Sequence, residues 1–291
     1  MTLVLSRRAL LAGLAAFAAA APARAALSSA EIEARFVAIE AGAGGRLGVA
    51  VIDSGDGRRV GRRADQRFPM CSTFKALAAA AALKRVDEGA ERLDRSVAYG
   101  PADLLDYAPV TKAHLGEGAM TLGDICAAAI QWSDNTAANL LLAAIGGPAG
   151  FTQFARSLGD QVTRLDRDEP SLNSAIPGDE RDTTTPMAMA RDLQAVLLGD
   201  ALSPASRRQL EAWMIGDKVG DKRLRAGLPP DWGIGDKTGT GDHGVANAIA
   251  ILRPPGRAPL FAAVYYAESL GSPDERDAVH REVARTVAEG F

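Results

Sequence analysis

Cysteine and histidine are scarce in this sequence, and their scarcity excludes several kinds of site. The 291 residues include two cysteines, Cys71 and Cys126, and three histidines that lie far apart. No H-x-H, H-E-x-x-H or C-x-x-C pattern occurs, so we expect no metal site and no cofactor. Two cysteines do not make a disulfide framework. A serine nucleophile would need lysine or glutamate as its base, because no local Ser-His-Asp motif is present.

Long apolar runs and an excess of positive charge are also missing beyond the first 25 residues. An apolar run over residues 9–21 follows two arginines and precedes an Ala-x-Ala sequence at residues 23–25. This pattern predicts a signal peptide over residues 1–25, read by the twin-arginine or the ordinary secretory route. We therefore expect an exported protein, periplasmic or secreted, whose mature chain has no membrane span. Removing the signal changes the formal net charge from −3 to −6 because three arginines leave with it. That balance argues against a nucleic-acid binder.

Apolar patterns place strands near both ends of the mature chain and helices between them. The strand-like segments are residues 47–52, 58–63, 233–238, 245–252 and 260–267. The helix-like segments are residues 29–40, 72–88, 122–130, 136–144, 147–158, 185–198, 203–214 and 273–289.

The simplest arrangement of these segments is an α/β plus all-α fold. One five-stranded antiparallel sheet is built from both chain ends and flanked by helices, and a large helical domain is inserted. We place the α/β domain at residues 26–63 and 218–291, and the helical domain at residues 64–217. A cleft between two such domains is a natural active site.

Ser72 and Lys75 form a Ser-x-x-Lys sequence at the start of an alanine-rich helix. Residues three apart lie on one face of a helix, so the hydroxyl and the amine can meet. A serine at a helix N-terminus lies near unpaired backbone N–H groups, which suits a nucleophile whose reaction builds negative charge. On its own, the pair is also what an ordinary exposed helical turn would contain.

Three further short motifs follow in the chain: a Ser-Asp-Asn sequence, a glutamate in a polar loop, and a Lys-Thr-Gly sequence after a predicted strand. They are residues 133–135, Glu169 and residues 237–239. Each alone has an ordinary explanation, such as a helix N-cap, a solvated carboxylate or a strand end. Together and in this order, the four motifs resemble those of the class A serine β-lactamases. The resemblance covers residues 27–291 and extends to segments such as 107–111 and 164–173.

The resemblance implies a catalytic role for four side chains. Ser72 would be the nucleophile, and Lys75 or Glu169 would take its proton, a question the sequence leaves open. Ser133 would pass a proton to the leaving nitrogen. Glu169 would activate the water that hydrolyses the acyl-enzyme. The backbone N–H groups of Ser72 and Thr240 would hold the oxyanion.

The resemblance also implies a set of substrate-binding residues. Asn135 would contact the acylamide side chain of the substrate, and Asn173 would help Glu169 to hold the water. The full set is Asn135, Asn173, Lys237, Thr238, Thr240, Arg223 and Tyr107.

Three members of this set carry alternatives. Arg223 is expected to bind the substrate carboxylate, because Ala246 stands where many family members have an arginine. The alternative is a solvent-facing arginine. Thr240 either reaches the substrate carboxylate and favours cephalosporins or is only a strand residue. Tyr107 either stacks along the cleft wall or is a partly buried core tyrosine.

Two further pairs of residues are expected to be structural. Arg167 and Asp182 resemble the ion pair that closes the loop carrying Glu169.

The two cysteines are the second pair. Some family members, notably the carbapenem-hydrolysing branch, have a disulfide between a cysteine before the nucleophile and one after the Lys-Thr-Gly turn. Here the second position is Gly241. We expect Cys71 and Cys126 to be free and buried.

The function that the resemblance implies is hydrolysis of the β-lactam amide of penicillins and cephalosporins through a serine acyl-enzyme, which would confer antibiotic resistance. The expected partner is the small-molecule substrate alone, and the expected state is a monomer. A DD-peptidase, a covalent penicillin-sensing protein and a serine amidase or esterase on the same scaffold are alternatives. The glutamate in the loop favours the hydrolase, because it supplies fast deacylation.

Overall fold

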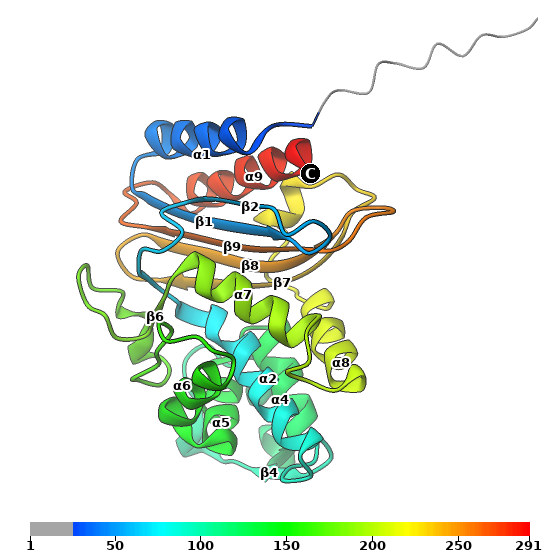
Figure 1. The fold of residues 1–291 in the computed structure, drawn as a ribbon. Helices are drawn as coiled ribbons and strands as arrows, with labels where there is room; N and C mark the ends of the chain where they lie inside the picture. Colours follow the sequence, from blue (N-terminus) through cyan, green and yellow to red (C-terminus); the bar gives the residue numbers. More distant parts are fainter. Residues whose placement is uncertain (1–25) are drawn as a thin grey trace, which may run out of the picture.

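A five-stranded antiparallel sheet with the strand order β2-β1-β9-β8-β7 is the frame of the molecule (Figure 1). The computed structural model describes residues 26–291, so the predicted signal peptide lies outside the described residues. The strands are β1 (Arg46–Asp53), β2 (Arg59–Arg62), β7 (Gly233–Gly241), β8 (Val245–Arg253) and β9 (Leu260–Ala267). The first and last parts of the mature chain thus share one sheet, as predicted.

Two helices from the chain ends cover one face of the sheet (Figure 1). They are α1 (Ser29–Ala43) and α9 (Pro273–Gly290). Each begins with a capping box, in which a serine and a glutamate three residues later satisfy each other's backbone N–H groups. Phe36 of α1 and Val283 of α9 pack with Val49 of β1 in one apolar cluster. This layer closes the outer face of the sheet.

The remaining helices gather on the opposite face of the sheet (Figure 1). They are α2 (Phe74–Asp87), α3 (Pro109–Ala113), α4 (Leu122–Gln131), α5 (Asn135–Ile145), α6 (Gly147–Ser157), α7 (Pro186–Leu197) and α8 (Pro204–Ile215). Helix α7 packs directly against β1 and β9, and α2 contacts α4, α5, α6, α7 and α8. A second apolar cluster runs without a break from the inner face of the sheet into these helices. Because the two predicted domains share this cluster, their boundaries stay a prediction.

Helix α2 lies at the centre of the helical layer. Its first ten residues, from Phe74 to Leu83, are all buried. Most of them are alanines, which are the strongest helix formers and let neighbouring helices approach closely. The helix predicted at residues 72–88 agrees with α2 except at its start. There, a 3₁₀ turn, η1 (Cys71–Thr73), precedes α2.

Strand β7 differs from its prediction in a way that matters for the site. The sequence pattern ended the strand at Thr238, because the glycines that follow are typical of turns. The strand in fact continues to Gly241, and Thr240 pairs with Ala246 of β8. Helix α1 also extends three residues beyond its prediction, and the other long elements agree to within one residue at each end.

Several short elements were not predicted because two or three residues show no period. Two small antiparallel pairs join β3 (Phe68–Pro69) with β6 (Thr183–Thr184) and β4 (Ser96–Ala98) with β5 (Ala119–Thr121). Both cysteines are buried and free, as expected. Within residues 26–291, no helix combines the length and the apolar character needed to cross a membrane.

Candidate active site

The four sequence motifs meet at one cavity of about 310 Å³, beside the end of strand β7. The residues that line this cavity are Ser72, Tyr107, Ser133, Asn135, Asn173, Val219, Arg223, Thr238, Gly239 and Thr240. Lys75, Glu169 and Lys237 are almost completely buried, with exposed fractions of 0%, 2% and 0%. A buried amine or carboxylate next to a polar cavity is typical of catalytic groups, because burial perturbs proton affinity.

Ser72 lies in turn η1, where the chain enters helix α2. The residue is 8% exposed, and its Oγ donates a hydrogen bond to Glu169 Oε1 at 3.3 Å. The sequence indicated that this hydroxyl and the Lys75 amine can meet on one helical face. In the structure, both groups contact the same carboxylate oxygen, since Lys75 Nζ lies 2.9 Å from Glu169 Oε1. Cys71, just before Ser72, has a positive φ of 45°, a sparsely populated conformation for a residue with a side chain.

Lys75 and Glu169 form an ion pair with no solvent exposure of either side chain. Lys75 Nζ lies 2.9 Å from Glu169 Oε1, and the exposed fraction of each side chain is 0%. The same amine donates to Asn135 Oδ1 at 2.7 Å and to the Ser133 carbonyl at 2.8 Å. Burial lowers the pKa of Lys75, and the Glu169 carboxylate opposes that effect. Ser72, Glu169, Lys75 and Asn135 therefore belong to one network of short polar contacts.

Lys237 supplies a second buried cation on the other side of Ser133. Its Nζ donates to Ser133 Oγ at 3.0 Å and to the Thr238 carbonyl at 2.8 Å. Burial, with the nearby Lys75 and Arg223 cations, lowers the pKa of Lys237 to about 7. Ser133 itself has a positive φ of 56°, so its backbone is held in an uncommon conformation. The Ser133 hydroxyl thus lies between two amines.

Asp134 fixes this arrangement, although the sequence suggested only an N-cap for it. It is the N-cap of α5, and its Oδ1 accepts from the Ala137 N–H at 2.8 Å. Its Oδ2 accepts from the N–H groups of Val110 and Thr111, both at 2.9 Å. One buried carboxylate therefore joins α3 to α5 and orients the residues on either side of it.

The loop that carries Glu169 is closed by the predicted pair. Arg167 Nε donates to Asp182 Oδ2 at 2.6 Å, and Asp182 Oδ1 accepts from the N–H groups of Asp166 and Arg167 at 2.8 and 2.9 Å. Asn173 Nδ2 donates to Glu169 Oε2 at 2.5 Å. Asn139 was not predicted to act here. Its amide clamps the backbone of Glu169 by two hydrogen bonds of 2.9 Å.

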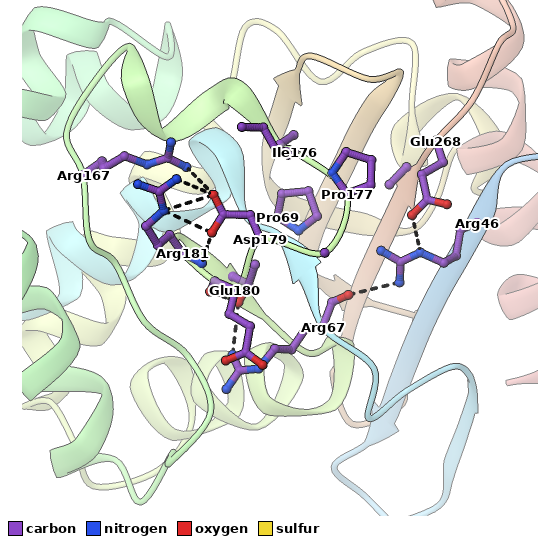
Figure 2. Close-up of a pocket in the computed structure, with 14 residues that line it drawn as sticks. Arg46, Arg67, Pro69, Arg167, Ile176, Pro177, Asp179, Glu180, Arg181 and Glu268 are labelled. Carbon is purple, nitrogen blue, oxygen red and sulfur yellow. Dashed lines mark hydrogen bonds and ion pairs between the residues drawn. The ribbon is translucent and has the colours of Figure 1, made fainter.

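The far side of this loop forms a different hollow of about 380 Å³ (Figure 2). Arg167 and Arg181 both point toward the Asp179 carboxylate there, and Arg46 bonds with Glu268 (Figure 2). The Ser72 nucleophile, the Lys75 amine and the Lys-Thr-Gly strand do not line it. The cavity at Ser72 is therefore the better candidate site, although it is the smaller of the two.

Gly239 brings strand β7 against the nucleophile turn, a role that the sequence motif did not reveal. A Cβ atom at this position would lie 2.8 Å from the Met70 carbonyl oxygen and 3.2 Å from Thr73 Cγ2. Only glycine leaves room for this approach. Gly241 is similar, since its Cβ would lie 2.6 Å from Cys71 Sγ and 2.7 Å from the Asn173 carbonyl. The two glycines set the width of the cavity.

Arg223 is not the solvent-facing residue of the alternative prediction. Its side chain is 12% exposed, against 73% for Lys222, and its Nε bonds with Asp277 Oδ1 at 2.8 Å. Its Nη2 donates to Thr240 Oγ1 at 2.8 Å, and its Nη1 donates to two backbone carbonyls of the sheet. Asp277 of α9, a residue far from the motifs in sequence, therefore aims the guanidinium at the cavity.

Tyr107 lies on the wall of the cavity and is 50% exposed, so it is not a core residue. Its hydroxyl donates to the Trp132 carbonyl at 3.1 Å. Val219, which the sequence did not single out, is 37% exposed and lines the cavity. In the part of the chain that the structure describes, no group of three or more His, Cys, Asp or Glu side chains could hold a metal ion.

Comparison with known proteins gives a consistent result. The model of the Beta-lactamase enzyme family matches residues 30–291. β-Lactamase CTX-M-8 of Citrobacter amalonaticus is 47% identical over 261 residues, covering 90% of this chain and 89% of the relative. β-Lactamase AST-1 of Nocardia asteroides is 47% identical over 264 residues, covering 91% and 85%.

Solved structures agree with the sequence relatives. An ancestral (GNCA) class A β-lactamase superposes with a TM-score of 0.88 at 62% identity, covering 89% of this chain and 100% of that one. PenP of Rhodopseudomonas palustris superposes with a TM-score of 0.88 at 55% identity, covering 90% and 100%. The motifs, the fold and these relatives together show that the chain belongs to the class A β-lactamases, the hydrolases that open the β-lactam amide through a serine.

Proposed function

We propose that Ser72, Lys75, Ser133 and Glu169 carry both steps of β-lactam hydrolysis in this chain. The observation that supports this proposal is the carboxylate oxygen Glu169 Oε1. It accepts from Ser72 Oγ at 3.3 Å and lies 2.9 Å from Lys75 Nζ. One base within reach of both the nucleophile and its neighbouring amine can serve the formation and the breakdown of an acyl-enzyme.

In the first step, Ser72 Oγ attacks the carbonyl carbon of the β-lactam ring. Its proton passes to Glu169, directly or by way of Lys75, and a tetrahedral oxyanion forms. The backbone N–H groups of Ser72 and Thr240 would bind that oxyanion. Gly239 supports this assignment because it lets β7 approach the Ser72 turn closely. Loss of one such donor costs about 3–4 kcal/mol of transition-state stabilisation.

Collapse of the oxyanion breaks the C–N bond, and the ring nitrogen needs a proton. Ser133 would donate its hydroxyl proton to that nitrogen and be reprotonated through the amines beside it. Lys237 Nζ lies 3.0 Å from Ser133 Oγ, and Lys75 Nζ lies 3.5 Å from the same atom. The positive charge of these amines stabilises the hydroxyl oxygen as its proton leaves. Before the second step, the proton that Glu169 took from Ser72 passes through Lys75 to Ser133, which gave its own proton to the ring nitrogen.

In the second step, Glu169 takes a proton from a water molecule as that water attacks the ester carbonyl carbon. The C–O bond to Ser72 then breaks, and Ser72 Oγ regains its proton from Glu169. Asn173 and Asn139 support this role, because they hold the side chain and the backbone of Glu169. This step separates a β-lactamase from a protein that remains acylated. For this reason, neither a penicillin-sensing protein nor a DD-peptidase is favoured.

The substrate carboxylate would lie against the positive end of the cavity. Arg223, Thr238 and Thr240 line that end, and the guanidinium already donates to Thr240 Oγ1 at 2.8 Å. The Lys237 amine lies buried behind Ser133, 3.0 Å from its Oγ. Asn135 would bind the acylamide side chain of the substrate from the opposite wall. Tyr107 would stack along the mouth of the cavity, where half of its surface is exposed.

One assay tests this function. Purified protein mixed with excess chromogenic cephalosporin should turn over repeatedly, and Ser72→Ala should be inactive at the same thermal stability. A single stoichiometric burst would support the sensing protein instead, and no colour change with either protein would support another serine hydrolase.

We also propose that the protein is exported to the periplasm or secreted, acts as a monomer and confers resistance on its host. Expression of the full-length gene should raise the resistance of a susceptible host. Deletion of residues 2–25 should abolish that resistance, because β-lactams act outside the cytoplasm. Light scattering of the purified mature protein should give a mass of one chain.

A further inference from the structure

Asn247 of strand β8 is a buried polar residue in an otherwise apolar row. Its exposed fraction is 0%, and its neighbours on the same face of the strand, Val245 and Ile249, belong to the apolar cluster between the sheet and the helices. Burial of a side-chain amide is unfavourable unless its polar atoms are hydrogen-bonded. The hydrogen-bond partners of Asn247 therefore indicate what this residue does.

The side-chain amide of Asn247 bonds to the chain just before the nucleophile. Its Nδ2 donates to the Pro69 carbonyl at 2.9 Å and to the Met70 carbonyl at 3.1 Å, and its Oδ1 accepts from the Tyr266 N–H at 3.3 Å. The opposite orientation of the amide would set its oxygen against two carbonyls and its nitrogen against an N–H group, so these partners fix the orientation. Both amide protons thus hold the segment that leads into Ser72.

Asn247 is the middle one of three residues that form a row across the sheet beneath the nucleophile turn. It pairs with Gly239 of β7 on one side and with Tyr265 of β9 on the other. The Tyr265 hydroxyl lies 3.2 Å from Thr73 Oγ1 and is the donor, because Thr73 Oγ1 gives its own proton to the Met70 carbonyl at 2.8 Å. The row therefore supports the turn both before and after the nucleophile.

The carbonyl that Asn247 holds lies next to a residue with an uncommon backbone conformation. Cys71, which follows Met70, has a positive φ of 45°. Such a conformation persists only where the surrounding structure holds it. The φ of Cys71 sets the direction of the next peptide group, which carries the Ser72 N–H. The hydrogen bond from Asn247 to Met70 thus acts on the first of the two proposed oxyanion donors.

We propose that Asn247 is a positioning residue for the oxyanion: its amide holds the turn that carries the Ser72 N–H in a fixed place relative to the Thr240 N–H. Gly239, the partner of Asn247 in β7, directly precedes Thr240, so both donors are held from one point of the sheet. The inference rests on the proposed role of these two N–H groups. Without the amide, two buried carbonyls would lose a donor and the turn would move, and small displacements of a catalytic group slow a reaction strongly.

Asn247→Leu tests the role, because leucine has a similar volume and neither donor nor acceptor. Acylation and deacylation both pass through an oxyanion in the same place. With a chromogenic cephalosporin, both rate constants should therefore fall by about tenfold or more, and KM should stay within about twofold of wild type because their ratio is kept. Wild-type rate constants in Asn247→Leu would overturn the positioning role.

Tyr266→Phe is the matched control. It also removes hydrogen bonds from a buried side chain to backbone carbonyls, those of Ala43 and Gly44 at 3.2 and 2.9 Å, but in the apolar cluster on the outer face of the sheet. This variant should lose thermal stability and keep both rate constants near wild type. An equal fall of the rate constants in Tyr266→Phe would show that Asn247 acts only through general stability and would overturn the proposal.

A boronic acid tests the oxyanion without turnover. Boron bonds to Ser72 Oγ and presents a hydroxyl group where the oxyanion would form, so the adduct mimics the tetrahedral intermediate. The Kd of phenylboronic acid should rise in Asn247→Leu by about the factor by which kcat/KM falls, and an unchanged Kd would overturn the proposal. If Asn247→Leu fails to fold, Asn247→Ser gives the same comparison, because its short side chain leaves room for water at the two carbonyls. Turnover by Ser72→Ala would refute the proposed function itself, whatever the result at Asn247.

Discussion

Lys75 Nζ lies 2.9 Å from Glu169 Oε1, and neither side chain reaches solvent. An ion pair this deeply buried is a poor source of stability, because desolvation of both charges offsets most of the Coulombic gain. It is better explained by chemistry. The pair keeps a carboxylate beside the Ser72 hydroxyl, and each partner supplies the charge that makes burial of the other tolerable.

The Arg167 and Asp182 pair offers the first prediction. Asp182→Asn should loosen the loop and slow the turnover of penicillins, because it leaves the Arg167 guanidinium without its buried partner. The free energy of unfolding should fall by about 3 kcal/mol, the lower end for a broken buried pair, since Arg167 is 21% exposed. Steady-state kinetics and urea unfolding measure the two effects. Arg92→Ala, which breaks a pair with exposed fractions of 76% and 72%, is the control and should change neither. Wild-type values in Asp182→Asn would refute the structural role.

Arg223 leads to a prediction about substrate affinity. Arg223→Ala should raise the KM for penicillins by about tenfold or more, because a charged hydrogen bond to the substrate carboxylate is lost. Lys222→Ala is the matched control, since its side chain is 73% exposed and its amine contacts the exposed Asp274. Small and equal effects of the two substitutions on KM would show that the substrate carboxylate binds elsewhere.

Lys237 leads to a prediction about pH. Its pKa of about 7 means that the ammonium loses its proton as the pH rises through neutrality. The kcat/KM for an anionic β-lactam should therefore decline above about pH 7, since this ratio reports the free enzyme. The Asp217 charge raises the pKa of Lys237, so Asp217→Asn should move that decline to lower pH. Asp274→Asn, which changes an acid with an exposed fraction of 82%, should leave it in place. An identical decline in wild type and Asp217→Asn would contradict this account.

Gly239 leads to a prediction about cavity width. Gly239→Ala should lower kcat/KM by about 10²-fold, because the new methyl group would lie 2.8 Å from the Met70 carbonyl and force β7 away from Ser72. Gly42→Ala is the control, since nothing lies within 4 Å of a Cβ at that position. Full activity of Gly239→Ala would mean that the oxyanion donors tolerate a wider cavity.

Much of the site was predictable because most of its catalytic residues belong to short sequence motifs. Ser72, Ser133, Glu169 and Lys237 each stand in a local pattern, and the periodicity of the chain placed the elements that carry them. The sheet was predictable because its strands alternate or run as apolar segments bounded by glycine and proline.

The parts that were missed depend on distant contacts. Asn139 and Asp277 act through partners 30 and 54 residues away in sequence, at Glu169 and Arg223. No local pattern contains such information. The 3₁₀ turn that precedes α2 and the contact of Ser72 with Glu169, 97 residues away, were also not predicted. The sequence alone could not distinguish a 3₁₀ turn from the first turn of an α-helix.

The central claim is that Glu169 completes the reaction that Ser72 begins. The most direct measurement is intact-protein mass after mixing Glu169→Ala with excess penicillin, followed over time beside wild type and Asn173→Ala. The account predicts that the acylated fraction of Glu169→Ala keeps one covalent adduct on Ser72. That adduct should persist long after wild type has hydrolysed its own acyl-enzyme. Release of that adduct at the wild-type rate would contradict the account, because the hydrolytic step would then not need Glu169.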